Sequence, residues 1–192
     1  MMRRACGLAL LACACAAAAA ELDSVQVARA GDTLRVALRA TLDAPAQASF
    51  AVFADPARLP AINPAVERVQ RLPAGRDGAP RFYTELHLCV LFYCRSLHQF
   101  QEVTSQPRPD GGALHAVLLP GGDFRSGHAE WNFAADGART RLQFSAELQP
   151  AFWLPPLVGP WLIERMLRDE AMRTGAGIER LARASDSAGA ER

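Results

Sequence analysis

The chain has 192 residues, of which 50% are hydrophobic, so it can form one globular domain with a substantial apolar core. Its 21 basic and 20 acidic residues give a formal net charge of +1, which provides no electrostatic basis for binding nucleic acid. Every basic residue is arginine, and the lack of lysine excludes a Walker-type phosphate lysine, a Schiff-base lysine and a pyridoxal-phosphate lysine. No cofactor is expected.

Residues 1–20 have the features of a signal peptide. A short basic segment precedes an apolar run, and small residues follow it up to Ala20. We therefore expect removal of residues 1–20 and a periplasmic or secreted protein. An alternative is a lipoprotein signal, because Leu-Leu-Ala precedes Cys13, which would then carry a lipid anchor. No stretch of 18 apolar residues follows this segment, so no membrane-spanning helix is expected.

The first predicted element after this segment is a β-hairpin. Residues 25–29 and 33–42 flank an Ala-Gly-Asp turn. Apolar and polar residues alternate along the second of these strands, which is typical of a strand with one buried and one solvated face.

Two short helices are predicted next. The first covers residues 44–54, with Asp43 as its N-cap. The second begins at Pro56, since proline is favoured at the first helical position, and it ends near Asn63, which precedes another proline.

A series of strands and one long helix complete the chain. Clusters of Gly, Pro and Asp separate the strands, which are predicted over residues 65–72, 81–90, 94–104, 113–119, 126–134 and 140–149. A helix follows from about Pro160 to Ala184, and residues 185–192 form a polar tail. An antiparallel sheet with one apolar face has to be covered, and this helix is the only predicted element long enough to cover it.

Several runs of residues in this order resemble those of the START-like, or SRPBCC, superfamily. These runs are Gly31-Asp-Thr-Leu-Arg-Val, the Ala44-Pro45 helix with Asp55-Pro-Ala-Arg-Leu-Pro, Gly127 to Trp131-Asn-Phe, and Leu154-Pro-Pro-Leu-Val-Gly-Pro. The superfamily shares the helix-grip fold among polyketide cyclase/dehydrase-like proteins, coenzyme Q-binding proteins and the birch pollen allergen.

This resemblance implies an α+β domain over residues 21–184. A curved antiparallel sheet of six to eight strands would wrap around the long C-terminal helix, with two short helices after the first strands. It also implies a cavity for a hydrophobic small molecule or lipid between the sheet and the helix. It implies much less about activity, because the same fold serves carriers and enzymes.

Cys89 and Cys94 are the cysteines that remain once residues 1–20 are removed, and in an exported protein they are expected to form one disulfide. If they face each other across a hairpin, His87 lies opposite Ser96, and Glu85 lies opposite His98. The two histidines and two cysteines then share a face and could be read as four zinc ligands. An oxidised pair cannot bind zinc, however, so no metal site is predicted.

The other face of this hairpin is the more apolar and is predicted to face inward, whereas His87, Glu85 and His98 face solvent. Aromatic side chains of the neighbouring elements are expected to line the same space or to belong to the ordinary core. The residues predicted to contact ligand are Phe53, Phe82, Thr84, Leu86, Leu97, Gln99, Trp131, Phe144, Met166, Glu170 and Thr174.

The long helix has an apolar stripe that contains Glu170 and Thr174, with Glu179 and Arg183 on the opposite face. A carboxylate within such a stripe has to be paired, protonated or solvated. Glu170 could therefore bond to Arg173 near the surface, or it could serve as a polar anchor or proton acceptor in the cavity, facing Arg95. Gly177 would leave room for ligand or allow close packing against the sheet.

Three functions remain open from the sequence. The chain is an exported binding protein for an apolar ligand, a cyclase or dehydratase with Glu170 as general base, or a non-catalytic interaction module of the cell envelope. The inward-facing residues favour binding, because they make a poor set of acids and bases. Leu91, Phe92 and Tyr93 form an apolar hairpin tip that would contact a neighbouring loop, a membrane surface or a partner.

Overall fold

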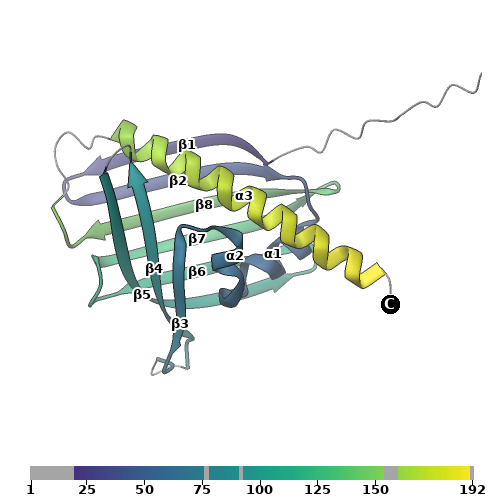
Figure 1. The fold of residues 1–192 in the computed structure, drawn as a ribbon, viewed down its shortest axis with the longest axis horizontal. Helices are drawn as coiled ribbons and strands as arrows, with labels where there is room; N and C mark the ends of the chain where they lie inside the picture. The colour runs from purple at the N-terminus through teal and green to yellow at the C-terminus, as the bar shows by residue number, and fades with distance from the viewer. Residues whose placement is uncertain (1–19, 76–77, 91–92, 154–159, 191–192) are drawn as a thin grey trace, which may run out of the picture.

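The computed structural model describes residues 20–75, 78–90, 93–153 and 160–190 (Figure 1). Its strands are β1 (Glu21–Ala30), β2 (Thr33–Leu42), β3 (Val66–Leu72), β4 (Arg81–Val90), β5 (Tyr93–Arg108), β6 (Gly111–Leu119), β7 (Phe124–Asp136) and β8 (Arg139–Pro150). Its helices are α1 (Ala46–Phe53), the 3-10 turn η1 (Pro56–Arg58), α2 (Leu59–Ile62) and α3 (Pro160–Ala190). Residues 1–19, which include Cys13 and all of the predicted signal peptide except its last residue, Ala20, lie outside the described residues.

The strands form one antiparallel sheet in the order β1-β2-β8-β7-β6-β5-β4-β3. The sheet is strongly twisted, so that β3, β4 and β5 run across the direction of β1, β2 and β8 (Figure 1). Helix α3 lies across one face of this sheet, and α1 and α2 lie beside it (Figure 1). The predicted α+β helix-grip architecture is confirmed, with eight strands.

The β1–β2 hairpin has the predicted alternation. Gly31 has a φ of 60° in the turn, a conformation that glycine adopts without steric cost. Along β2 the inward side chains are buried and the intervening ones are mostly exposed; the buried set is Leu34, Val36, Leu38, Ala40 and Leu42. The apolar face of β2 is therefore part of the core.

The two short helices occur where predicted, but the first is not capped by Asp43. Helix α1 begins after Pro45 without a side-chain cap. Asp43 instead accepts a hydrogen bond from Arg183 of α3 at 2.8 Å, because α3 passes over the corner between β2 and α1. Asp55, by contrast, does cap η1, with its carboxylate accepting from the backbone N–H of Ala57 at 3.0 Å.

The helix α3 begins at Pro160 as predicted, but it continues beyond Ala184 to Ala190. The predicted polar tail is therefore helical over most of its length. The segment contains alanine and no proline, and its polarity alone does not end a helix that is already formed. Among the described residues, no helix is both long and apolar enough to cross a membrane.

Among the described residues, the core consists of two clusters that contact different parts of α3. The larger one lies around α1 and the later part of α3 and includes Phe50, Phe133, Ile178 and Ala182. The smaller one joins β1 and β2 to Leu167 on the earlier part of α3. The space between this earlier part and the rest of the sheet contains the candidate site.

Candidate functional site

A cavity of about 480 Å³ lies between α3 and the inner face of the sheet. Strands β2 to β8 and all of the helices contribute to its wall. Its volume falls within the range of known small-molecule sites, about 300–1,000 Å³. Most of the lining side chains are apolar, and the polar ones among the described lining residues are Asn63, Thr84, Arg95, Gln99, Gln101, Glu170 and Thr174.

The structure brings all of the predicted ligand-contacting residues to this one cavity. They are Phe53, Phe82, Thr84, Leu86, Leu97, Gln99, Trp131, Phe144, Met166, Glu170 and Thr174. Contact with a ligand stays a prediction for each of them. Their common location follows from the register of β4 and β5, which is as predicted: Leu86 pairs with Leu97 and Thr84 with Gln99.

A row of aromatic rings forms one part of the cavity wall. The Trp131 ring lies between those of Phe53 and Phe144, with centroid separations of 5.6 and 5.1 Å. Phe53 also contacts Phe133 at 5.5 Å, and Phe133 belongs to the filled core. The row therefore fixes the boundary at which the packed core ends and the cavity begins.

A polar cluster on α3 and α2 faces the same cavity. The Asn63 side-chain amide donates to Glu170 Oε2 and to Thr174 Oγ1, both at 2.9 Å. Arg173 donates to the other Glu170 oxygen at 2.7 Å. The Glu170 side chain is only 14% exposed. Glu170 is thus both paired with Arg173 and part of the cavity wall. From the sequence alone these two positions are alternatives, and the structure shows both together.

The cluster depends on how α2 ends. The Asn63 backbone N–H completes α2 by bonding to Leu59, and its side-chain oxygen accepts from the N–H of Ala65. These bonds fix the amide so that its nitrogen points at α3. The sequence marks Asn63 only as a helix end before a proline, and no local pattern predicts contacts with Glu170 and Thr174, more than a hundred residues away.

Arg95 forms the second charged part of the wall. It pairs with Asp123 at 2.7 Å, and its guanidinium lies 4.0 Å from the centroid of the Phe152 ring. Burial of the Asp123 carboxylate acts to raise its pKa, but bonds from the His98 backbone N–H and from Arg95 outweigh this and hold the pKa below its ordinary value. Glu170 and Arg95 line the same cavity, with Arg173 and Asp123 as their respective ion-pair partners. That Glu170 faces Arg95 stays a prediction.

The sheet side of the cavity carries uncharged polar groups. Gln101 donates to the hydroxyl of Thr84 at 3.1 Å, and Gln99 lines the wall beside them. These amides and hydroxyls can orient a ligand by hydrogen bonding. Among the described lining residues, Glu170 is the only carboxylate, and neither histidine nor tyrosine is present.

Gly177 does not leave room for a ligand. A Cβ atom at this position would collide with the backbone carbonyl of Ile62. At Gly175 it would lie 3.2 Å from the Leu42 side chain, which remains after removal of residues 1–20. Close packing is therefore the reason for both glycines, although Gly177 packs against α2 and not against the sheet.

The position of Glu179 differs from the prediction, which placed it on the face of the helix opposite the apolar stripe. It is buried and accepts a hydrogen bond from the backbone N–H of Asp43 at 2.6 Å. The helical period placed it on the solvent face opposite the apolar stripe. The chain between β2 and α1 covers that second face of α3, which only the tertiary arrangement determines.

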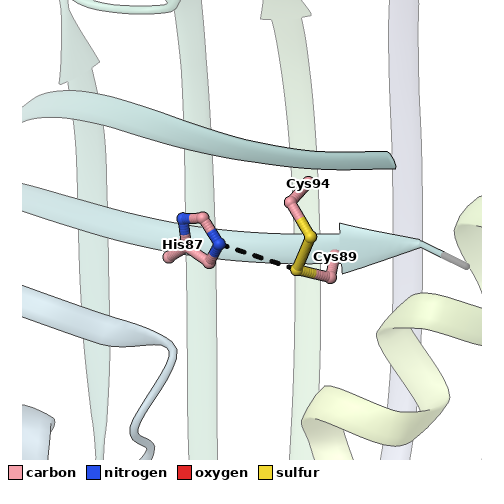
Figure 2. Close-up of side chains that lie close together, drawn as sticks. All are labelled: His87, Cys89 and Cys94. Atoms are coloured by element: carbon pink, nitrogen blue, oxygen red, sulfur yellow. Dashed lines mark hydrogen bonds between the residues drawn. A yellow bond between two sulfur atoms is a disulfide. The ribbon is translucent and has the colours of Figure 1, made fainter. Parts of the chain in front are cut away.

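The outer face of the β4–β5 hairpin carries the predicted disulfide between Cys89 and Cys94 (Figure 2). His87, Cys89 and Cys94 are exposed, as predicted for this face. His98 has a different partner: its Nδ1 atom shares a hydrogen bond of 2.7 Å with the Tyr83 hydroxyl. Leu91 and Phe92 lie outside the described residues, as does the side chain of Tyr93.

The family model for "Polyketide cyclase / dehydrase and lipid transport" matches residues 42–173. The chain belongs to this family. The match extends from the end of β2 into α3, so it includes most of the sheet and most of the residues that line the cavity. A comparison with curated proteins finds no match.

Solved structures with the same fold include three bacterial proteins. TTHA0849 from Thermus thermophilus is 16% identical, with a TM-score of 0.61 over 79% of this chain and 98% of that one. A START superfamily protein from Mycobacterium smegmatis is 18% identical, with a TM-score of 0.60 over 77% and 98%. The Zhui aromatase/cyclase from Streptomyces sp. R1128 is also 18% identical, with a TM-score of 0.60 over 82% and 98%. At these identities the likeness concerns the fold alone.

Proposed function

We propose that this protein binds a hydrophobic small molecule or lipid in the cavity between the sheet and α3. The observation that carries the proposal is the cavity itself, about 480 Å³ in volume and lined mainly by apolar side chains. Burying an apolar ligand in such a space is favourable by roughly 25 cal/mol for each Å² removed from water. The few polar groups then orient the ligand's polar end.

The polar end of the ligand has two candidate anchors in this proposal. Glu170, Asn63 and Thr174 form one on the helix side. Thr84, Gln99 and Gln101 form the other on the sheet side. A ligand with hydroxyl or carbonyl groups on an apolar skeleton matches both, because these side chains donate and accept hydrogen bonds without a strong net charge.

The test is to purify the full chain from its own organism and to analyse bound molecules by native mass spectrometry and solvent extraction. We expect a co-purifying apolar compound. The variant Leu97→Trp fills part of the cavity, and we expect it to purify without the compound. Val117→Trp is the matched control, because Val117 is 52% exposed on β6, and it is expected to retain the compound. Equal retention by both variants would contradict binding in this cavity.

A cyclase or dehydratase is the second candidate, and Glu170 is its only described lining carboxylate. In this hypothesis Glu170 acts as general base on a bound apolar substrate. Among the described lining residues, no histidine, tyrosine or second carboxylate accompanies it, so no second group is in place to return the proton that the base removes. Binding without chemistry is therefore the better supported function.

Glu170→Gln separates these two functions. In a binding protein the variant folds normally and changes only the retention of ligand, because the amide keeps the shape of the carboxylate. In an enzyme it abolishes turnover of a bound substrate while binding persists. A third hypothesis, an envelope interaction module without a ligand, requires a closed or filled cavity, and the volume of this cavity weighs against it.

Export and contact with a membrane are part of the proposal. The signal-like residues 1–20 support a periplasmic or secreted protein, with lipidation of Cys13 as the alternative. Mass measurement of the mature N-terminus distinguishes the two. An apolar tip at Leu91, Phe92 and Tyr93 would contact lipid during ligand exchange. The variant with Leu91, Phe92 and Tyr93 all replaced by serine is expected to associate with membranes more weakly than the unaltered chain does, as measured by sedimentation with lipid vesicles.

A further inference from the structure

His87, Cys89 and Cys94 gather on the β4–β5 hairpin (Figure 2). Leu86 and Leu88 of the same strand line the cavity, so strand alternation places these three side chains on the other face of the sheet. One ligand atom from each of the three lies within 4.8 Å of the others. All three residues are exposed to solvent. The two sulfur atoms are joined as a disulfide in this structure. Once reduced, they would supply two thiolates beside an accessible imidazole, the donor types that zinc prefers.

The imidazole of His87 is already aimed at the sulfur atoms. Its Nε2 atom lies 3.6 Å from Cys89 Sγ (Figure 2). Zinc bonds to sulfur at about 2.3 Å and to histidine nitrogen at about 2.0–2.1 Å, so two such ligands on a tetrahedral ion are about 3.6 Å apart. The distance between His87 and Cys89 thus matches one edge of a tetrahedral zinc site.

The other ring nitrogen of His87 has a partner that holds the ring in place. Nδ1 lies 3.2 Å from the hydroxyl of Ser96, which is the cross-strand neighbour of His87 on β5. Histidine ligands of zinc commonly use their second nitrogen in this way, because the hydrogen bond fixes the tautomer and the orientation of the ring. The contact leaves Nε2 available for a metal.

We propose that the reduced form of the Cys89–Cys94 pair, together with His87, binds Zn²⁺. A dithiol reductant supplies two electrons and two protons, so that the S–S bond breaks, two thiols form and the reductant becomes a disulfide. Zinc then displaces the two thiol protons and binds two thiolates and the His87 Nε2 atom. Water occupies the fourth position, and the disulfide form has no thiolate to offer.

The test uses the full-length chain with Cys6, Cys13 and Cys15 replaced by serine, so that Cys89 and Cys94 are its only thiols. The chain is reduced, freed of reductant under argon, and titrated with Zn²⁺ against a chromophoric chelator. Co²⁺ serves as a second probe, because thiolate ligation gives it a charge-transfer band. We expect one bound metal per reduced chain and none when the disulfide is intact.

Three variants test the geometry. Ser96→Ala is expected to weaken Zn²⁺ binding by about 10- to 100-fold, the range for partners that orient a ligand, and His87→Ala is expected to weaken it further. His98→Ala is the control, because His98 bonds to Tyr83, and it is expected to bind Zn²⁺ as the parent does. Circular dichroism verifies that each variant folds. Equal Zn²⁺ affinity of the reduced and oxidised chains, or of His87→Ala and its parent, would overturn the proposal.

Discussion

The two halves of α3 face very different surroundings. From Gly175 to Ala182 the helix is packed against α1, α2 and β2, and Ile178 and Ala182 are both 0% exposed. From Leu162 to Thr174 the same helix lines a cavity. One continuous helix thus closes a filled core at one end and lines a cavity at the other.

The cause of the difference is side-chain size on α3 together with what lies opposite. Glycine and alanine in the later half let the helix approach α2 closely, and Phe50 and Phe133 fill the remaining space. In the earlier half, longer side chains such as Met166 and Leu167 line the cavity between the helix and the sheet. Close packing stabilises the fold, so the other half can remain open for a ligand.

The largest expected effect comes from truncating an aromatic ring in each half. Phe133→Ala removes a fully buried ring from the filled half, and it is expected to lower the free energy of unfolding by about 3–5 kcal/mol. Phe82 lines the cavity and is half-buried, so Phe82→Ala is expected to cost on the order of 1–2 kcal/mol. Urea denaturation measures both, and equal losses would mean that the two halves are equally packed.

A second comparison adds volume to each half. On helix propensity alone Gly177→Ala would stabilise α3 by about 1 kcal/mol. The added Cβ collides with the Ile62 carbonyl, so we expect a net loss of about 1–3 kcal/mol in a thermal melt. Leu97→Phe adds a larger group to the cavity wall and is expected to cost less than about 1 kcal/mol. Stabilisation by Gly177→Ala would refute the close contact between α2 and α3.

The open half is expected to depend on the disulfide of its β4–β5 hairpin. Replacing Cys89 and Cys94 together by serine is expected to lower the free energy of unfolding by about 2 kcal/mol in the chain-entropy model. Reduction of the unaltered chain, without added metal, should give the same loss in urea denaturation. If neither change alters stability, the register of the two strands is held by their side chains alone.

The smallest expected effect concerns pH at the Arg95–Asp123 pair. The folded-state pKa of Asp123 is below its ordinary value of 3.8, so its stabilising contribution is complete above that value and is lost as the pH falls through the lower, folded-state pKa. Asp123→Asn is expected to cost about 1 kcal/mol at neutral pH, and the difference from the parent should shrink in acid. Asp32 forms an exposed pair with Arg125, and Asp32→Asn is the control. It is expected to leave the pH dependence of the free energy of unfolding in acid unchanged.

Much of the site could be predicted because β-strands have a period of two. Once Cys89 is placed opposite Cys94, every other pair in the hairpin follows, so Leu86, Leu97 and Gln99 are assigned to the inner face together. The same reasoning along α3 placed Met166, Glu170 and Thr174 on the cavity side. Local periodicity therefore identified which side chains share a face.

Periodicity could not identify the partners of those side chains. Asn63 reaches Glu170 across 107 positions, and Glu179 bonds to Asp43 across 136. Neither contact leaves a local pattern, since each depends on how the corner after β2 and the end of α2 fold back onto α3. For the same reason the sequence placed Glu179 in solvent. It also predicted that Asp43 caps the helix after β2, whereas Asp43 bonds to Arg183 and Glu179 of α3.

The sequence by itself determined the order of the elements, the inward and outward faces of the strands, and the pairing of the two cysteines, because each of these depends on residues close together in the chain. Only the tertiary structure decided where the interior is filled and where it stays open. That outcome depends on the distance between α3 and a twisted sheet, and this distance is set by contacts, such as Gly177 with Ile62, between segments far apart in sequence.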